Sequence, residues 1–304
     1  MEGRAESVWC LVRPPGHHAT PSQSMGFCFV NHAGVAAMHA RARYGVRRVA
    51  VLDPDVHHGN GTQDGFRDDP DLFYASTHVG YGFYPGTGSR KDAKGREDRL
   101  VNVPFREGEG SSEKFRQAWA EEIFPKLRKF QPELIILSMG FDAVAEDPLG
   151  EMELRPEDFE WFSREVRRVG GRKGGREGGR EGCKVVSILE GGYDLAALGA
   201  CTIAHVRGLL GATRAGEGEE GEGEGEGEGE GEEGPEVHLL PPVTMRDEEE
   251  LVEGLKEVGL CVSGRRPGRN KVRATQKTTP TTICGCDMCF FGVWVYKVVQ
   301  DLVM

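Results

Sequence analysis

The stretch VAVLDPDVHHGNG, residues 49–61, joins a short apolar run to a dense group of acidic and histidine residues. Its first four residues are all apolar, which is typical of a strand buried on both faces of a parallel sheet. Pro54 and the glycines that follow then predict a loop. Functional residues of α/β proteins gather where parallel strands end, so this stretch indicates both a fold class and a site.

Other parts of the chain repeat this pattern of an apolar run followed by polar or turn residues. Together with residues 48–52, strands are expected at 8–12, 134–138 and 184–189. Amphipathic or Ala-rich stretches that favour helices lie between them, at residues 31–44, 111–130 and 156–169, the second with a Ser at its start as the cap. Alternating strands and helices predict an α/β domain with a parallel sheet flanked by helices.

The composition excludes several classes of protein. The 304 residues carry a formal charge of −11, but residues 217–236 hold eleven Glu and no Lys or Arg, so the rest of the chain is neutral overall. No nucleic-acid binding is therefore predicted. The eight Cys lack paired spacing in the body of the chain, no secretory signal is visible, and the most apolar stretch, 289–299, is too short to span a bilayer. We expect a soluble intracellular protein, in the nucleus or the cytoplasm.

The polar residues after the strands predict a metal site. Alternate residues of an extended chain share a face, so Asp53, Asp55 and His57 should project together. Asp142, which follows the run at 134–138, adds a carboxylate from another strand end. Two carboxylates and one imidazole suit a divalent ion such as zinc and leave a position for water and substrate. We predict Asp55, His57 and Asp142 as the zinc ligands.

Groups for acid–base chemistry come from two other strand ends. His17 and His18 follow the first run, and an imidazole can accept a proton from water and return it to a leaving amine. The far ring nitrogen of such a base needs an acceptor, for which Asp53 and Asn60 are candidates. Tyr193, after two glycines, can donate its hydroxyl to an oxyanion. Together these groups describe metal-assisted amide hydrolysis.

Each of these features has an ordinary structural explanation when it stands alone. His-His pairs are usually surface or structural residues, and a Phe-Asp or Gly-Gly-Tyr at a strand end is mostly capping or turn chemistry. Their joint occurrence at four predicted strand ends favours the catalytic interpretation.

Seven sequence blocks resemble, in order and approximate spacing, those of the histone deacetylase family across about residues 8–212. They are RPPGHHA at 13–19, MGFC at 25–28, DPDVHHGNGT at 53–62, YPGTG at 84–88, GFDA at 140–143, DPL at 147–149 and LEGGY at 189–193. The opening Arg-Pro-Pro-Gly and the Gly-Asn-Gly turn resemble the class II branch and its bacterial relatives.

The resemblance implies the arginase/deacetylase fold, with three layers, and zinc-dependent removal of acetyl groups from lysine side chains. It matches His18 to the general base, His17 to a partner that steadies or protonates the transition state, and Tyr193 to the oxyanion donor. The walls of the tunnel for the acyl-lysine stem match Gly26, Phe27 and Tyr84. The resemblance also implies a second ion, potassium. The positions that match its ligands, partly through their backbone carbonyls, are Asp53, Asp55, His57, Ser76 and Thr77. The implied partners are acetylated proteins or peptides, and chromatin complexes.

The resemblance also divides the chain. It implies a catalytic domain at 8–212 with a Gly-rich insertion at 170–182, followed by a disordered Gly/Glu linker at 213–236 and a tail at 237–304 whose structure and function the sequence does not indicate. In the tail we expect one helix at 245–260, and plain thiols rather than a metal site at Cys284, Cys286 and Cys289. The family has a substantial portion before the His-His block, so the domain is expected to be incomplete at its N-terminus.

Departures from the family pattern leave the matched ligands and catalytic groups intact. Tyr84 stands where Phe is frequent, and Val144, Met139 and His32 replace the common residues at their positions. Two alternatives stay open beside a protein deacetylase: a deacetylase of small acetylated amines such as polyamines, and an inactive binding module.

Overall fold

The structure, a computed structural model of the chain, describes residues 7–170 and 183–211. The expected linker and the whole tail, with its helix and its three cysteines, lie outside these residues. Residues 171–182 of the Gly-rich insertion also lie outside them.

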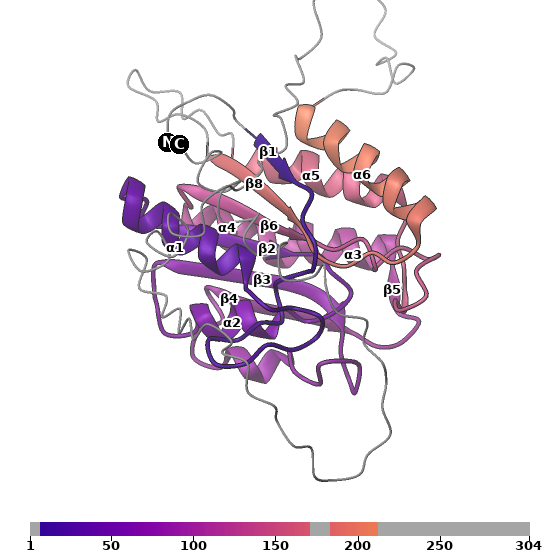
Figure 1. Cartoon of the computed structure of the whole chain (residues 1–304), viewed down its shortest axis with the longest axis horizontal. Helices are drawn as coiled ribbons and strands as arrows, with labels where there is room; N and C mark the ends of the chain where they lie inside the picture. The colour runs from indigo at the N-terminus through magenta and orange to yellow at the C-terminus, as the bar shows by residue number, and fades with distance from the viewer. Residues whose placement is uncertain (1–6, 171–182, 212–304) are drawn as a thin grey trace, which may run out of the picture.

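A parallel sheet of six strands forms the centre of the fold (Figure 1), with the strand order β1-β8-β6-β2-β3-β4. All neighbouring pairs in it are parallel. Its strands are β1 (Ser7–Cys10), β2 (Val49–Asp53), β3 (Leu72–Val79), β4 (Leu100–Phe105), β6 (Leu134–Met139) and β8 (Lys184–Leu189). The predicted fold class is confirmed, and the four strands predicted from sequence are neighbours in the sheet.

Helices cover both faces of the sheet because side chains alternate along each strand. Val49 and Val51 of β2 pack in one apolar cluster with α1 (His32–Tyr44) and α2 (Asn60–Phe66). Ala50 and Leu52 pack in the other, against the helices of the opposite face: α3 (Ser112–Gln117), η2 (Ala118–Ile123), α4 (Phe124–Phe130), α5 (Pro156–Gly170) and α6 (Leu195–Leu210). The result is three layers, helix, sheet and helix (Figure 1).

The predicted helix at 111–130 is in fact three segments. Ser111 is its cap, as predicted, and accepts a hydrogen bond from the Lys114 N–H. The central segment η2 is a π-helix. Pro125 has no N–H to bond the carbonyl of Glu121, which favours a local change of helical type. The wider turn keeps the apolar residues, four positions apart, on one face, and Phe115, Trp119 and Ile123 are all fully buried.

Several elements were not predicted. Strand β3 contains Ser, Thr and His, and β4 contains Asn and Pro; β4 is an edge strand, where Pro is tolerated. Helix α6 begins at an Asp194 cap and ends at Gly211 in the left-handed region. Short elements complete the fold: η1 (Arg90–Ala93) and a two-stranded pair of β5 (Gly110–Ser111) and β7 (Met152–Glu153).

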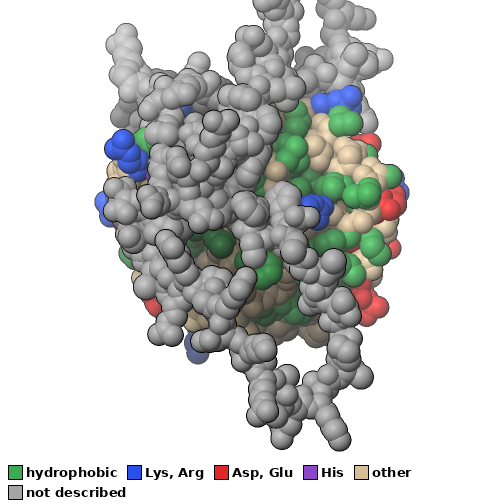
Figure 2. Space-filling model, viewed as in Figure 1, with side chains coloured by type: hydrophobic (Ala, Val, Ile, Leu, Met, Phe, Trp, Pro, Cys, Tyr) green, Lys and Arg blue, Asp and Glu red, His purple; other side chains and the backbone are tan. Residues whose placement is uncertain are grey.

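Helix α6 carries apolar residues on its outer side as well. Leu195 is 80 % exposed and Ile203 is 56 % exposed. Figure 2 shows apolar side chains beside a few charged ones over the part of this face where Figure 1 places α6. Within the described ranges, no helix combines the length and the apolar character needed to cross a bilayer.

The aromatic cluster between α5 and the η2 region predicts a large effect on stability. Phe162 is fully buried, and its ring lies 4.6 Å from that of Trp119. Replacing a buried Phe by Ala leaves a cavity, so Phe162→Ala should lower the free energy of unfolding by about 3–5 kcal/mol, measured by denaturant titration. The exposed Ile203→Ala should change it by less than about 0.5 kcal/mol. Equal effects of the two variants would contradict this packing.

Candidate metal centre

The predicted ligands come from two neighbouring strand ends. After β2 ends at Asp53, the chain bends instead of continuing as an extended strand. The Asp55 carboxylate accepts the His57 N–H at 2.8 Å, and these two side chains meet as predicted. The Asp53 carboxylate lies beside the same region, where it contacts His17 Nδ1 at 3.0 Å, while Asp55 Oδ1 lies 3.8 Å from His17 Nε2.

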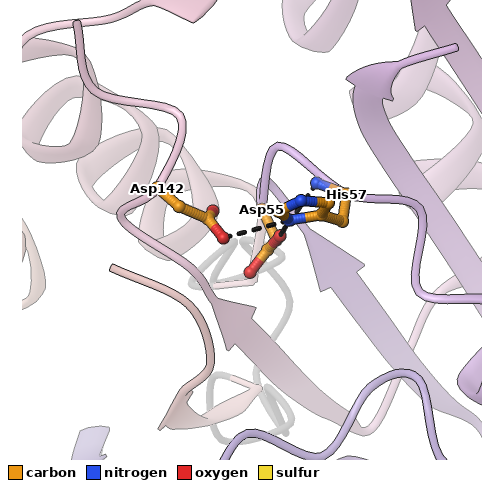
Figure 3. A group of neighbouring side chains, drawn as sticks. All are labelled: Asp55, His57 and Asp142. Carbon is orange, nitrogen blue, oxygen red and sulfur yellow. Dashed lines mark hydrogen bonds and ion pairs between the residues drawn. The ribbon is translucent and has the colours of Figure 1, made fainter. Parts of the chain in front are cut away.

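Asp55, His57 and Asp142 form one compact group, with ligand atoms all within 4.8 Å of one another. His57 Nδ1 lies 3.2 Å from Asp55 Oδ1 and 3.1 Å from Asp142 Oδ2. Figure 3 shows Asp142 reaching toward the other two from a separate loop. Both carboxylates are buried, while the His57 side chain is 13 % exposed. One nitrogen and two oxygens therefore converge on one point.

Backbone groups orient the two carboxylates. The Gly191 N–H donates to Asp55 Oδ2 at 3.1 Å, and the Val56 N–H donates to Asp142 Oδ1 at 3.1 Å. The Asp55 and Asp142 oxygens that these amides leave free face His57. A Cβ at Gly140 would overlap the Asp55 carboxylate, and one at Gly191 would overlap that of Asp142. The glycines thus make the space in which the carboxylates sit.

The electrostatics of the group fit a divalent cation. Burial and the nearby Asp55 charge raise the pKa of Asp142 to about 7. Burial lowers the pKa of His57, but its hydrogen bonds to Asp142 and Asp55 raise it to about 10. Two buried carboxylates this close favour a positive charge between them. Two carboxylates and an imidazole are also a common donor set for zinc, so the residues present fit that ion.

The two adjacent histidines have different partners. His18 Nδ1–H donates to Asn60 Oδ1 at 2.8 Å, and His17 Nδ1–H donates to Asp53 Oδ2 at 3.0 Å. Because a carbonyl oxygen only accepts, the Asn60 contact places the proton of neutral His18 on Nδ1 and leaves Nε2 able to accept one. Asp53 and Asn60 had been predicted as acceptors, and the structure assigns one to each histidine.

These contacts give the two histidines opposite charge preferences. Burial and the charge of His17 lower the pKa of His18 to about 3. Burial also lowers the pKa of His17, but the Asp55 and Asp53 carboxylates raise it well above its ordinary value. The site therefore places a protonated imidazole beside a neutral one, with ring centroids 4.1 Å apart.

Tyr193 follows β8 on a turn through Gly191 and Gly192, where φ at Gly192 is 128°. Burial and the negative charges of Asp142 and Asp55 raise the pKa of Tyr193 above its ordinary value. The phenol therefore keeps its proton and can act as a hydrogen-bond donor.

The residues matched to the tunnel lie beside these groups. The Tyr84 ring is 5.1 Å from that of His18, and the Phe27 ring is 6.1 Å from that of Tyr193. Gly26 has a φ of 55°, and a Cβ there would overlap the His18 ring. Phe83 was not predicted, yet its ring stacks on His57 at 5.0 Å. Aromatic rings therefore flank the histidines and the tyrosine.

The residues matched to a potassium site are neighbours in the sheet, since Asp53 of β2 pairs with Ser76 of β3. Ser76 Oγ lies 2.8 Å from His78 Nδ1, and Thr77 Oγ1 accepts the Trp119 indole N–H at 3.1 Å. These hydroxyls already have protein partners, and the potassium site stays a prediction.

Two buried residues with no predicted role support the histidines. The Tyr74 hydroxyl donates to Asp53 Oδ2 at 3.1 Å and accepts the Gly59 N–H at 3.0 Å. Glu190 Oε2 accepts the N–H groups of Gly16 and His17 at 2.6 and 3.0 Å. An acidic residue directly after an apolar strand was a signal for Glu190, whereas Tyr74 lies in a strand that the sequence pattern did not reveal.

A parallel α/β fold with an Asp-His-Asp group beside two histidines at its carboxyl edge defines a recognisable class of protein. The family model for the histone deacetylase domain matches residues 1–209, and the chain belongs to that family.

Relatives agree with this assignment. Histone deacetylase 14, chloroplastic, of Arabidopsis thaliana is 39 % identical over 210 residues, covering 67 % of this chain and 46 % of that protein. The histone deacetylase-like amidohydrolase of Pseudomonas aeruginosa is 41 % identical over 218 residues, covering 71 % and 55 %. The crystal structure of the HDA15 HD domain matches with a TM-score of 0.63 and 38 % identity, covering 69 % and 58 %. The chain thus spans about half the length of these relatives, and the predicted arginase/deacetylase fold is confirmed.

The glycine beside Asp55 provides a test of the metal centre. Gly140→Ala should push the Asp55 carboxylate away from His57 and weaken zinc binding at least about tenfold, a loss of about 1.4 kcal/mol. Zinc affinity is measured by competition with a chromophoric chelator. Gly199→Ala is the matched control, because a Cβ there meets nothing within 4 Å and Ala favours the α6 helix. Equal zinc affinity in both variants would contradict the proposed ligand arrangement.

Proposed function

We propose that this protein is a zinc-dependent deacetylase that hydrolyses the acetyl amide of N-acetyl-lysine in histones or other proteins. The observation that carries the proposal is the pairing of a neutral His18, held by Asn60, with a compact Asp55–His57–Asp142 group. Family membership supports the same reaction class.

Asp55, His57 and Asp142 would hold the zinc. When bound, this ion supplies a Lewis acid that polarises the acetyl carbonyl and makes the attacking water more acidic. Two carboxylate ligands balance the charge of the ion, so the water also needs a separate base. His18 fits this role because its Nδ1–H is held by Asn60 and its Nε2 is free to take the proton.

The other groups act on the negative charge and on the leaving amine. Tyr193 keeps its phenolic proton and donates a hydrogen bond to the oxygen that becomes negative. His17 is held in its cationic form by Asp53 and Asp55, so it stabilises the same negative charge and can give a proton to the departing lysine amine. The Tyr74 hydroxyl and Glu190 carboxylate fix Asp53 and the His17 backbone.

The aromatic residues fit an extended apolar stem. The rings of Phe27 and Tyr84 lie beside Tyr193 and His18, and Phe83 lies on His57. A four-carbon lysine stem between such rings keeps its apolar surface out of water. We therefore propose Gly26, Phe27 and Tyr84 as walls of the substrate tunnel.

Removing the base tests the proposal. His18→Ala should lower kcat on an acetyl-lysine peptide by about 10²- to 10⁴-fold while the zinc content stays at the wild-type level. Turnover is measured with zinc-loaded full-length chain. His39→Gln is the matched control: it replaces a buried histidine on α1, whose ring contacts Tyr44, and should keep most of the turnover.

Full turnover by His18→Ala would refute the assigned base. Acetylated polyamines are assayed beside the peptide, and a preference for them would replace the protein substrate by a small amine. A folded, zinc-loaded wild-type chain that turns over neither substrate would refute the proposed function and favour a binding module.

A further inference from the structure

Asp147 is the acidic residue of the DPL block, at 147–149, which has no part in the chemistry described so far. Its side chain is buried, with 6 % exposure. Oδ2 accepts the N–H of Tyr193 at 2.6 Å and that of Asp194 at 3.3 Å, and Oδ1 accepts the Leu149 N–H at 2.9 Å. One carboxylate thus binds the backbone of Tyr193 directly.

The loop that carries Asp147 is built onto the metal ligand Asp142. The Asp147 N–H donates to the Val144 carbonyl at 3.1 Å, and the Gly150 N–H donates to the Asp147 carbonyl at 3.4 Å. A Cβ at Gly150 would overlap the Asp142 carbonyl oxygen, so the end of the loop lies directly on the backbone of that ligand. The position of Asp147 is therefore tied to the position of Asp142.

The turn that carries Tyr193 needs external support. Gly191 and Gly192 allow many backbone conformations, and Gly192 has a positive φ. Three hydrogen bonds hold the glycines: the Gly191 N–H donates to Asp55, the Phe141 N–H donates to the Gly191 carbonyl at 3.0 Å, and Arg13 donates to the Gly192 carbonyl at 2.7 Å. The Asp147 carboxylate holds the next two residues. A carboxylate that accepts two amide protons forms charge-assisted hydrogen bonds, which are stronger than neutral ones.

We propose that Asp147 is a positioning residue that fixes the Tyr193 hydroxyl relative to the Asp55–His57–Asp142 centre. It joins the loop of a metal ligand to the turn of the oxyanion donor by a side-chain bond to the Tyr193 N–H. The role in turnover rests on the proposed function, since it acts through Tyr193. A misplacement of about 1 Å in such a group can reduce turnover about 100-fold.

A double-mutant cycle with Tyr193→Phe tests this role. Asp147→Ala should lower kcat on an acetyl-lysine peptide by about 10- to 100-fold with KM changed by less than about threefold. In the Tyr193→Phe background, where the hydroxyl is absent, Asp147→Ala should reduce kcat by less than about twofold further. The same loss in both backgrounds would show a general structural effect and overturn the proposal.

Two further variants keep the test decisive if Asp147→Ala folds poorly. Asp147→Asn keeps one acceptor oxygen for the Tyr193 N–H but presents an amide nitrogen to the Leu149 N–H, so its kcat should lie between those of the wild type and Asp147→Ala. Asp158→Asn is the matched control. Asp158 is also buried and also accepts a backbone N–H, that of Arg155 at 2.9 Å, but it lies at the start of α5. Its replacement should leave kcat unchanged.

Hydrogen–deuterium exchange gives a readout that needs no activity. In the zinc-loaded chain, the peptide that contains the Tyr193 and Asp194 amides should exchange at least about tenfold faster in Asp147→Ala than in the wild type or in Asp158→Asn, with Asp147→Asn between them. Unchanged exchange would overturn the proposal even if kcat fell. If the wild type had no turnover, the proposed function would fail, while the exchange rates would still decide whether Asp147 holds the turn.

Discussion

Parallel pairing of four neighbouring strands, β1, β8, β6 and β2, is the constraint on which the site depends. Their carboxyl ends lie at one edge of the sheet, and each end continues into a different part of the site. The histidine pair follows β1, Tyr193 follows β8, Asp142 follows β6, and Asp55 with His57 follows β2. No two of these four segments are close in sequence, so the ladder of backbone hydrogen bonds brings them together.

Burial of this edge places several negative charges out of water, and these charges need compensation. Asp53, Asp55, Asp142 and Glu190 are all buried within it. Isolated buried carboxylates are strongly unfavourable unless cations or hydrogen-bond donors accompany them. His17 and backbone amides provide part of this compensation, and the proposed cation at the Asp55–Asp142 pair would provide the rest. The proposed metal binding and the proposed acid–base chemistry would thus both follow from the same excess of negative charge.

The sequence predicted much of this edge because apolar runs such as 134–138 end abruptly at polar groups. It predicted less of the other half of the sheet. Strand β3 reads LFYASTHV, whose Ser, Thr and His are buried against other polar groups, and therefore lacks a continuous apolar pattern. Because the apolar pattern does not predict β3, it also does not predict Tyr74 as a partner of Asp53. Which histidine bonds Asp53 and which bonds Asn60 depends on the bend after β2, and the spacing of residues along the chain does not determine that bend.

Acidic residues at this edge share a further property: each of their carboxylates accepts a hydrogen bond from the backbone of a neighbouring loop. Asp55 accepts the Gly191 N–H, Asp142 accepts the Val56 N–H, and Glu190 accepts two amides from the histidine segment. A loop that is held in this way responds to the charge of the group that holds it. Replacing Asp55 by Asn would change a proposed metal ligand and would also weaken the bond to the Gly191 N–H, because a charged acceptor binds an amide more strongly than a neutral one. The ligands and the loops of this site are therefore one connected structure, and the effect of changing a ligand should extend to the turn that carries Tyr193.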